Sequence, residues 1–388
     1  MTERRFGYRW TIIALLFIAT TINYVDRQVL GILAPTLQRD LAWSETDYGD
    51  IVSWFSFVYA LGFLGVGRVI DRVGIKRGLG AAVVAWSAAA MAHALARSAA
   101  GFSIARAALG LSESAIFPAA LKTIAEWFPR RERALAAGIV NAATNTGAIV
   151  APLVVPAITL RWGWQWAFIL TGAIGLLWLA LWIPLYRDPA AHPRVSEAEL
   201  THIRSDGPDA NEAAVPWVRL LGYRQTWAYA IGKLFADPVW FFYLYWLPKF
   251  LDTRYGVKLS ALALPLIVVY VIADVGSVAG GWLSSRLIAR GWSVNSARKT
   301  AMLLMACIIV PTAFVTHAPN QWTAVLMVAA AAACFRAPRS ARWLASVRSP
   351  ARWGALSFSE RSAAYSTRTA SSTVRFSWCA VWPTSWDG

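Results

Sequence analysis

Long apolar stretches alternate with short polar ones along most of this chain. Most of the apolar stretches are about 20 residues long, enough for one helix to cross a hydrocarbon core of roughly 30 Å. We therefore predict about ten helices, at residues 10–34, 48–69, 79–97, 101–125, 133–157, 165–186, 226–250, 262–288, 299–317 and 321–334. The pattern predicts an all-α, polytopic membrane protein.

A polar stretch divides the predicted helices into two sets. It has the sequence "RDPAAHPRVSEAELTHIRSDGPDANEAAVP", and its proline and acidic residues are typical of a linker. The resulting domains are a six-helix bundle (1–186), a cytoplasmic linker (187–225), an incomplete second bundle of about four helices (226–333) and an aberrant tail (334–388). Two bundles joined in this way are typical of a transporter with its site between repeated halves.

An internal repeat supports this organisation. "GRVIDRVGIKR" joins the second and third predicted helices, and "GWLSSRLIARG" joins the eighth and ninth. Gly67 matches Gly281 and Arg72 matches Arg286, whereas Asp71 is replaced by Ser285. The two loops occupy the same place in their halves, as a repeated architecture requires.

Composition and charge agree with a membrane protein and exclude other classes. The chain is 57% hydrophobic and 15% charged, with a mean hydropathy of +0.46, and soluble domains are about a quarter charged. Basic residues cluster in alternate loops, which predicts a cytoplasmic N-terminus. The aberrant tail contributes +6 of the net charge of +16, and we predict no nucleic-acid partner. We find no signal peptide, and the three cysteines form no disulfide or metal framework.

The last 55 residues have a different composition. From Cys334 onward there is no Ile, Met, Asn, Lys or His, but there are eight Arg and eleven Ser. In a shifted reading frame, the third base of each codon is read with the first two bases of the next codon. With permitted synonymous codons, Cys334–Gly354 can then be reread as a Gly-rich apolar helix preceded by F-P-R. The same tripeptide, Phe128-Pro129-Arg130, precedes the fifth helix. We infer a reading-frame shift; the alternative is a basic, disordered tail.

Ionisable residues inside membrane helices are costly, so each is a candidate site residue. Asn23, Asp26 and Arg27 share one broad face of the first helix, and Arg106 and Glu113 lie two turns apart with Gly110 between them. Tyr59, Asn145 and Lys233 are further candidates on other helices. Fixed cations suit a carboxylate, buried acids can carry protons, and hydroxyl, amide and aromatic groups suit a polyol.

The residues therefore predict a proton-coupled carrier of an organic anion with several hydroxyl groups. They do not predict an enzyme, because the chain has no nucleophile–base set, metal-ligand spacing or phosphate loop. We expect no cofactor. His93, near the end of the third helix, is expected to be a wetted interfacial residue.

The loop between the second and third helices fits the pattern G-x-x-x-D-R-x-G-x-[RK]-[RK] at every position. It strongly resembles the signature loop of the major facilitator superfamily, with a fold of two six-helix bundles. The resemblance implies that this loop gates the conformational change, its acid pairing with a helix end or a basic partner in one conformation only. The residues concerned are Gly67, Asp71, Arg72, Gly74, Lys76 and Arg77.

Further stretches resemble one branch of that superfamily. "NYVDR", "ARAALGLSESAIFPA", "EWFPRRERALAAGI" and "DPVWFFYLYWLPKFL" resemble the anion:cation symporter family, closest to its hexuronate and sugar-acid transporters. The resemblance covers roughly residues 8–333 and implies proton-coupled import of a sugar acid by a monomer in the bacterial inner membrane. The implied substrate contacts are Arg27, Tyr59, Asn145, Lys233 and Asn23; the implied proton-coupling residues are Asp26 and Glu113, with Arg106 as the charge partner of Glu113.

Several alternatives remain open at this point. Asp26–Arg27 and Arg106–Glu113 could be structural ion pairs, and the Lys233 side chain could extend to the membrane surface instead of a site. The substrate could be another organic anion, such as a tartrate- or phthalate-like carboxylate. The chain could also be an inactive, frameshifted copy of such a transporter, or a membrane sensor.

Overall fold

A computed structural model describes residues 7–206 and 221–347. The described residues are almost entirely helical and contain no strand. The chain divides into two compact units, which are described separately. Unit 1 comprises Met1–Pro208 and Leu244–Ile267, and unit 2 comprises Asp209–Tyr243 and Val268–Gly388. The predicted boundaries at residues 186, 225 and 333 remain predictions.

Unit 1 contains six membrane-length spans and the helix that follows them. Its elements are α1 (Arg9–Leu41), α2 (Glu45–Val73), α3 (Ile75–Ala92), η1 (His93–Leu95), α4 (Ala99–Glu113), α5 (Ile116–Trp127), α6 (Arg130–Trp162), α7 (Trp164–Leu185), η2 (Pro189–Ala191) and α8 (Glu197–Ile203). The C-terminal part of α10 (Arg224–Tyr255), from Leu244 onward, also belongs to it. These bounds match the predicted helices to within about five residues, except that α1 continues to Leu41, beyond its predicted end at 34, and that the fourth span is divided.

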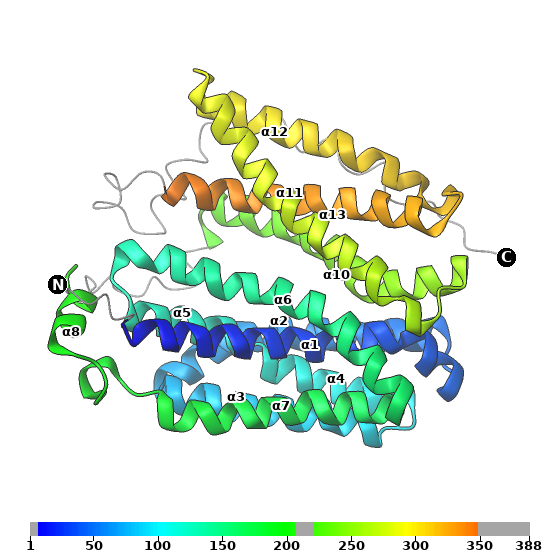
Figure 1. Ribbon diagram of the computed structural model, residues 1–388, viewed down its shortest axis with the longest axis horizontal. Coiled ribbons are helices and arrows are strands. Elements are labelled where there is room, and N and C mark those ends of the chain that lie inside the picture. The colour runs from blue at the N-terminus through cyan, green and yellow to red at the C-terminus, as the bar shows by residue number, and fades with distance from the viewer. Residues whose placement is uncertain (1–6, 207–220, 348–388) are drawn as a thin grey trace. The chain divides into compact units, whose positions relative to one another are not determined.

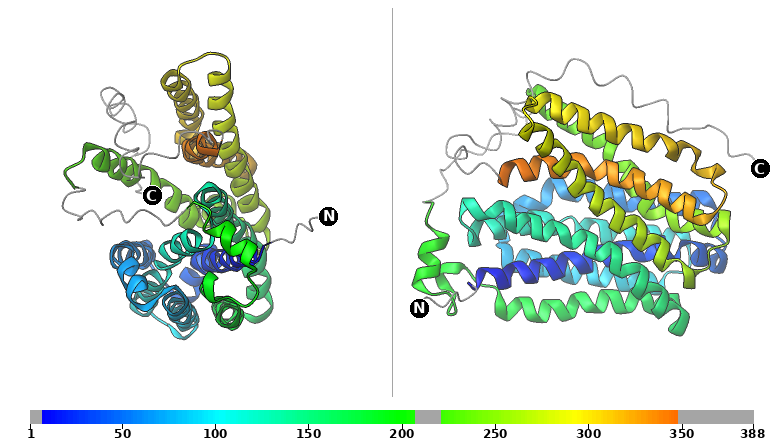
Figure 2. Two further views of the ribbon diagram at one scale, coloured as in Figure 1. Left: turned by 90° about the vertical axis from the view of Figure 1, so that its left-hand side faces the viewer. Right: turned by 45° about the horizontal axis from the view of Figure 1, so that its top comes forward.

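α1 lies at the centre of unit 1, and its middle and C-terminal parts are almost continuously buried. It packs between α6 and α7, while α2 packs on α4 and α3 packs on α7 (Figures 1 and 2). Gly147 on α6 permits the close contact with α1, because a Cβ at this position would lie 2.7 Å from the Thr21 carbonyl oxygen. Small residues at such crossings are typical of membrane helices. Polar residues on α1 are therefore enclosed by protein.

The fourth span is broken, although its sequence predicted one continuous helix over 101–125. α4 ends at Glu113 and α5 begins at Ile116. Pro118 has no N–H group to donate to the Ser114 carbonyl, so the regular hydrogen-bond ladder is interrupted here. Glu113 consequently occupies the last position of a half-helix inside the membrane span.

Unit 2 contains most of α11 (Ala263–Ala289), α12 (Val294–Ile309), η4 (Val310–His317) and α13 (Gln321–Val347). α12 packs on α13, and Gly276 on α11 lies directly against Ala333 on α13. The Thr312 hydroxyl donates to the Met327 carbonyl at 3.2 Å. α13 continues past Cys334 to Val347, and residues 348–388 of the predicted tail lie outside the described residues.

Eight of the described helices or helix pairs are long and apolar enough to cross a membrane. Many large apolar side chains on them are exposed, including Leu95, Ile104 and Leu177 at 82%, 71% and 68%. In a water-soluble protein such a surface would be unstable, whereas a bilayer covers it at no cost. The chain therefore has the architecture of a polytopic membrane protein.

Candidate functional site

A buried ion pair joins α1 to the break in the fourth span. The Arg27 side chain donates from Nε and Nη2 to the same Glu113 carboxylate oxygen, Oε2, at 3.0 and 2.8 Å. The Arg27 and Glu113 side chains are only 1% and 0% exposed. Gly110 makes the approach possible, because a Cβ there would lie 2.5 Å from the Phe55 carbonyl oxygen of α2. α4 can therefore lie close enough to the centre of the bundle to present Glu113 to Arg27.

Aromatic rings surround the Arg27 guanidinium. Its central carbon lies 4.8 Å from the Tyr24 ring centroid, 5.0 Å from Phe55 and 4.7 Å from Tyr59. Such faces attract a cation, and the attraction is strongest where water is excluded. The guanidinium is thus held at one place by a carboxylate and three rings, one of which belongs to Tyr59, a predicted substrate contact.

Asp26 lies beside Arg27 in the sequence but faces a different part of the bundle. Consecutive residues point about 100° apart on a helix, and Asp26 faces α7, on the side of the Thr171 hydroxyl. Its side chain is 2% exposed, and neither carboxylate oxygen has a hydrogen-bond partner among the described residues. The adjacent acid and base therefore do not form a pair with each other.

Arg106 differs from the expectation that it is the direct partner of Glu113. Its Nη1 donates to the Arg27 carbonyl oxygen at 3.3 Å, and its guanidinium lies 5.7 Å from the Phe55 ring. Glu113 and Asp26 are both within its electrostatic range. Its Nε and Nη2 atoms are buried and have no hydrogen-bond partner among the described residues. The direct ion pair of Glu113 is with Arg27, and Arg106 forms no ion pair with either acid among the described residues.

The other predicted site residues are placed as follows. Asn23 is fully buried on α1, and its amide has no partner among the described residues. Asn145 is half-buried on α6, where its Oδ1 accepts from the Thr144 hydroxyl at 3.3 Å. Lys233 falls on α10, but its side chain lies outside the described part of the chain.

A tyrosine that sequence reasoning missed completes the surroundings of the two arginines. Tyr245, on the C-terminal half of α10, is 1% exposed, lies 6.5 Å from the Phe55 ring centroid and is within electrostatic range of both Arg27 and Arg106. The Tyr48 hydroxyl donates to its carbonyl at 2.7 Å. The signal was present in "DPVWFFYLYWLPKFL", but an apolar aromatic run does not reveal which ring faces inward.

The acid of the loop between α2 and α3, Asp71, has a basic partner. Lys122 on α5 forms an ion pair with Asp71 and donates to the Gly67 carbonyl at 2.5 Å. Gly74 has φ +85°, a conformation that strongly favours glycine, and it joins the two helices directly. The Lys76 carbonyl accepts from the Trp182 indole at 3.2 Å. Arg72 and Arg77 are exposed.

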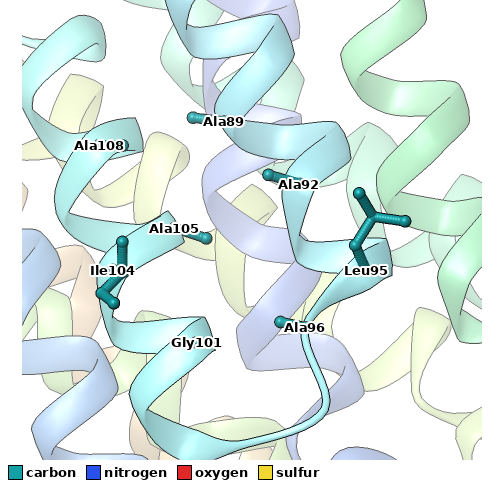
Figure 3. Close-up of a pocket in the computed structure, with 8 residues that line it drawn as sticks. All are labelled: Ala89, Ala92, Leu95, Ala96, Gly101, Ile104, Ala105 and Ala108. Atoms are coloured by element: carbon teal, nitrogen blue, oxygen red, sulfur yellow. The ribbon is translucent and has the colours of Figure 1, made fainter.

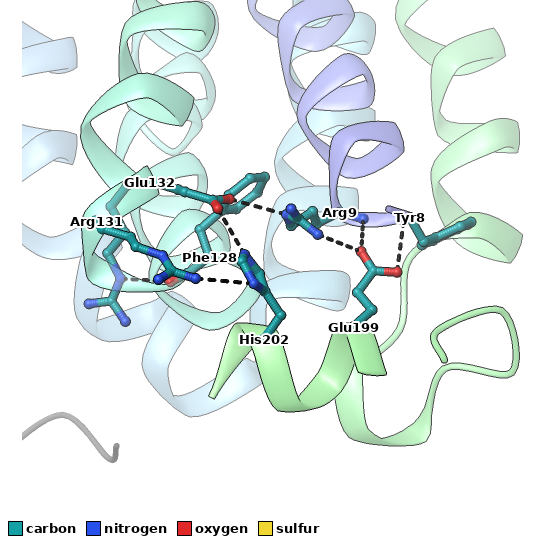
Figure 4. Close-up of polar contacts among 8 residues, drawn as sticks. Tyr8, Arg9, Phe128, Arg131, Glu132, Glu199 and His202 are labelled. Carbon is teal, nitrogen blue, oxygen red and sulfur yellow. Dashed lines mark hydrogen bonds and ion pairs between the residues drawn. The ribbon is translucent and has the colours of Figure 1, made fainter. Parts of the chain in front are cut away.

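A second group of charges lies at the end of unit 1 where α1 begins (Figure 4). Arg9 bridges Glu132 of α6, at 3.2 Å, and Glu199 of α8, at 3.3 Å. His202 of α8 donates to Glu132 at 2.8 Å, and Arg131 donates to His202 at 3.2 Å. We call Arg9, Arg131, Glu132, Glu199 and His202 the terminal ion cluster. It attaches the first helix of the linker to the bundle.

His93 contradicts its predicted interfacial position, because its side chain is 0% exposed. Its ring stacks on Phe168 at 4.9 Å and meets Phe102 edge-on at 5.5 Å. A shallow hollow of about 370 Å³ lies nearby between α3, η1 and α4, and Figure 3 shows it lined by Ala89, Ala92, Leu95, Ala96, Gly101, Ile104, Ala105 and Ala108. Because this lining is wholly apolar, the hollow is no place for a sugar acid.

No group of three or more His, Cys, Asp or Glu side chains in the described ranges could hold a metal ion. The charged groups instead form a set of two acids and two arginines inside the bundle, all nearly inaccessible to solvent. Such a set can exchange a proton and can bind a carboxylate through a guanidinium.

Comparison with known proteins identifies relatives over most of the chain. Residues 16–352 match the model of the Major Facilitator Superfamily. The galacturonate transporter of Dickeya chrysanthemi is 32% identical over 84% of this chain and 96% of its own length. The hexuronate transporter of Escherichia coli K12 is 32% identical over 83% of this chain and 76% of its own length.

Solved structures show the same fold. A bacterial homolog of the human lysosomal transporter Spinster, in an inward-facing and occupied conformation, has a TM-score of 0.67 at 20% identity. That match covers 88% of this chain and 78% of the other. The xylose transporter XylE from E. coli, in a partially occluded inward-open conformation, has a TM-score of 0.62 at 18% identity, covering 88% and 85% of the two chains.

Proposed function

This chain belongs to the major facilitator superfamily of membrane transporters, and we propose that it imports a sugar acid together with protons. It is a membrane-spanning transporter and not an enzyme. The proposed substrate is a hexuronate such as galacturonate or glucuronate, and the proposed location is the bacterial inner membrane with the N-terminus in the cytoplasm. The relatives named above, at 32% identity, support this substrate class.

One observation carries the proposal: the Arg27 guanidinium is enclosed by three rings and bound by the Glu113 carboxylate. In this arrangement Glu113 stands in for the carboxylate of a substrate, because both are anions that the same two N–H groups can bind. A sugar acid and ionised Glu113 therefore compete for Arg27. Protonating Glu113 removes its charge and frees Arg27 for the substrate.

This competition for Arg27 couples proton binding directly to substrate binding. Ionised Glu113 holds Arg27, so an unprotonated carrier has low affinity for the anion. A protonated carrier binds the anion, and deprotonation after the conformational change expels it. By linkage, the proton must then raise substrate affinity by the same factor as the substrate raises proton affinity. Asp26 is the second proposed proton carrier, since it is buried with no direct basic partner.

The remaining proposed contacts supply specificity. The phenols of Tyr59 and Tyr24 lie against Arg27 and can donate to hydroxyl groups of a sugar next to its carboxylate. Asn23, Asn145 and Lys233 stay proposed substrate contacts. Arg106, within electrostatic range of both acids, is proposed to stabilise their ionised forms.

The test is uptake of radiolabelled galacturonate and glucuronate in cells that lack their own transporters. The chain as given is compared with a version whose reading frame is restored after residue 333, and tartrate and phthalate serve as competitors. Saturable uptake that a proton uncoupler abolishes supports the proposal. Uptake that tartrate or phthalate blocks more strongly than sugar acids would replace the substrate class, and transport by the restored version alone would identify the given chain as a damaged copy.

A further inference from the structure

Several buried polar atoms in unit 1 have no hydrogen-bond partner among the described residues, and they belong to neighbouring elements. They include both Asp26 oxygens and the Asn23 amide on α1, Nε and Nη2 of Arg106 on α4, and Nε2 of His93 in η1. All of these side chains are at most 2% exposed. Buried polar groups in native proteins nearly always have a partner, which is either protein or ordered water. The group contains both donors and acceptors, so water can satisfy it.

The His93 ring has a defined protonation pattern. Its Nδ1 lies 2.7 Å from the Ala89 carbonyl oxygen and 3.2 Å from that of Ala90. A carbonyl oxygen can only accept, so Nδ1 carries the hydrogen and Nε2 of the neutral ring is a bare acceptor. Stacking on Phe168 and the edge contact with Phe102 fix the plane of the ring and therefore the direction of Nε2.

On α4, Phe102 meets this ring edge-on, and Arg106 lies four residues later on the same face of the helix, within electrostatic range of the ring. The other elements packed against η1 are α3 and α7. On α7 the residues Trp164, Phe168 and Thr171 do not titrate near neutral pH. Arg97 lies over the Trp164 ring. Arg106 is also within electrostatic range of Asp26, Glu113, Arg27, Tyr48 and Tyr245. Arg106 can thus interact both with a bare acceptor, His93 Nε2, and with the two carboxylates.

We propose that an ordered water joins His93 Nε2 to the free N–H groups of Arg106, and that His93 thereby acts as a positioning residue for proton coupling. This inference rests on the proposed function. The water bridge keeps the Arg106 guanidinium from forming a direct ion pair with Asp26. The Asp26 carboxylate is then not fully neutralised and can take up a proton. Without the acceptor, Arg106 donates to Asp26 directly and keeps it ionised.

Two substitutions separate this role from a merely structural one. His93→Asn keeps a donor at the place of Nδ1, which can bond the Ala89 carbonyl, but removes the acceptor at Nε2. His93→Gln extends an amide to the place of Nε2 and loses the Nδ1 bond. His317→Asn, at an exposed histidine of η4, is the control.

The first readout needs no sugar acid. The purified full-length chain is titrated while the infrared band of protonated buried carboxyl groups is recorded, and Asp26→Asn identifies the part that belongs to Asp26. In His93→Asn, the Asp26 part of the band should disappear at a pH about half a unit or more lower than in the wild type. His93→Gln and His317→Asn should leave it in place. In an Arg106→Gln background, His93→Asn should cause no further shift, because the guanidinium that it releases is gone.

The second readout is radiolabelled galacturonate binding as a function of pH. His93→Asn should lose affinity at a lower pH than the wild type, whereas His93→Gln should match the wild type. The inference is overturned if His93→Asn behaves like the wild type, or if only His93→Gln shifts either profile. A wild-type chain that binds no sugar acid contradicts the proposed function alone, since the infrared titration still decides the role of His93. If His93→Asn does not melt as a folded protein, His93→Thr, which also lacks the acceptor, takes its place.

Discussion

Two groups of ion pairs in unit 1 use the same kinds of residue in opposite surroundings. The pair of Arg27 and Glu113 in the middle of the bundle is 1% and 0% exposed. In the terminal ion cluster, Arg9 and Glu132 are 16% and 23% exposed, and His202 is 31% exposed. The N–O distances are similar, between 2.8 and 3.3 Å in both groups.

Distance alone therefore does not reveal what an ion pair contributes. Removing one partner of a buried pair leaves a charge without water, which costs about 3–5 kcal/mol. Removing one partner of a pair near the surface lets water replace it, and the cost is about 0–1 kcal/mol. A buried pair is thus sensitive to protonation and to a competing anion, whereas the terminal ion cluster serves as an attachment for α8.

The strongest test of this contrast is Arg27→Ala. It removes the proposed carboxylate contact, so galacturonate affinity should fall by about 30-fold or more. It also leaves Glu113 unpaired, so the melting temperature should fall. Adding Glu113→Gln removes the buried charge and should restore much of the melting temperature but none of the affinity. Unchanged affinity in Arg27→Ala would refute the carboxylate role of this residue.

The next effect is on coupling. Glu113→Gln cannot ionise and cannot hold Arg27 as an anion, so the carrier should still bind sugar acid at pH values at which ionised Glu113 has lowered the affinity of the wild type. Accumulation against a gradient should be abolished, whereas counterflow of labelled against unlabelled substrate should continue. Vesicles with an imposed pH gradient measure both. Uphill transport by this variant would contradict the assignment of Glu113 as a coupling acid.

A smaller effect is expected in the terminal ion cluster. Glu132→Gln removes the charge that Arg9 and His202 share, and water can replace it. We expect a cost of about 1 kcal/mol or less, which corresponds to a melting-temperature decrease of about 2–4 °C for a domain of this size. Galacturonate affinity should not change. A loss as large as that of Arg27→Ala would remove the distinction between the two groups.

The smallest effect concerns pH and His192, which follows the last span of unit 1. Burial lowers the pKa of the His192 ring; its Nδ1 accepts from the Arg194 N–H at 3.1 Å and its Nε2 faces the Leu185 carbonyl at 3.2 Å. Folding therefore favours the neutral ring. The resulting contribution to folding stability is present above the unfolded pKa of about 6.5 and is lost as the pH falls below it. The melting temperature should decrease from pH 7.5 to 5.5, and less so in His192→Phe, which keeps the ring contact with Tyr8.

Much of the fold could be predicted because membrane helices leave a strong signal. The apolar runs predicted most described helices to within about five residues, although α1 continues to Leu41 and α13 to Val347, beyond their predicted ends at 34 and 334. The glycine pattern placed the turn at Gly74. The break at Glu113 was missed, since Pro118 lies two positions after the next half-helix begins and the apolar run continues through it. His93 was misplaced because an isolated histidine near a helix end has the same local sequence whether it faces lipid, water or protein.

The cost of burying Asp26, Arg27, Arg106 and Glu113 makes each of them a candidate from the sequence alone. Their partners depend on how the helices pack. Arg27 pairs with Glu113, Arg106 donates to the Arg27 carbonyl, and Lys122 pairs with Asp71. The physical reason is that helical periodicity fixes the face on which a side chain lies, whereas the close approach of α4 to α2 at Gly110 sets which faces meet.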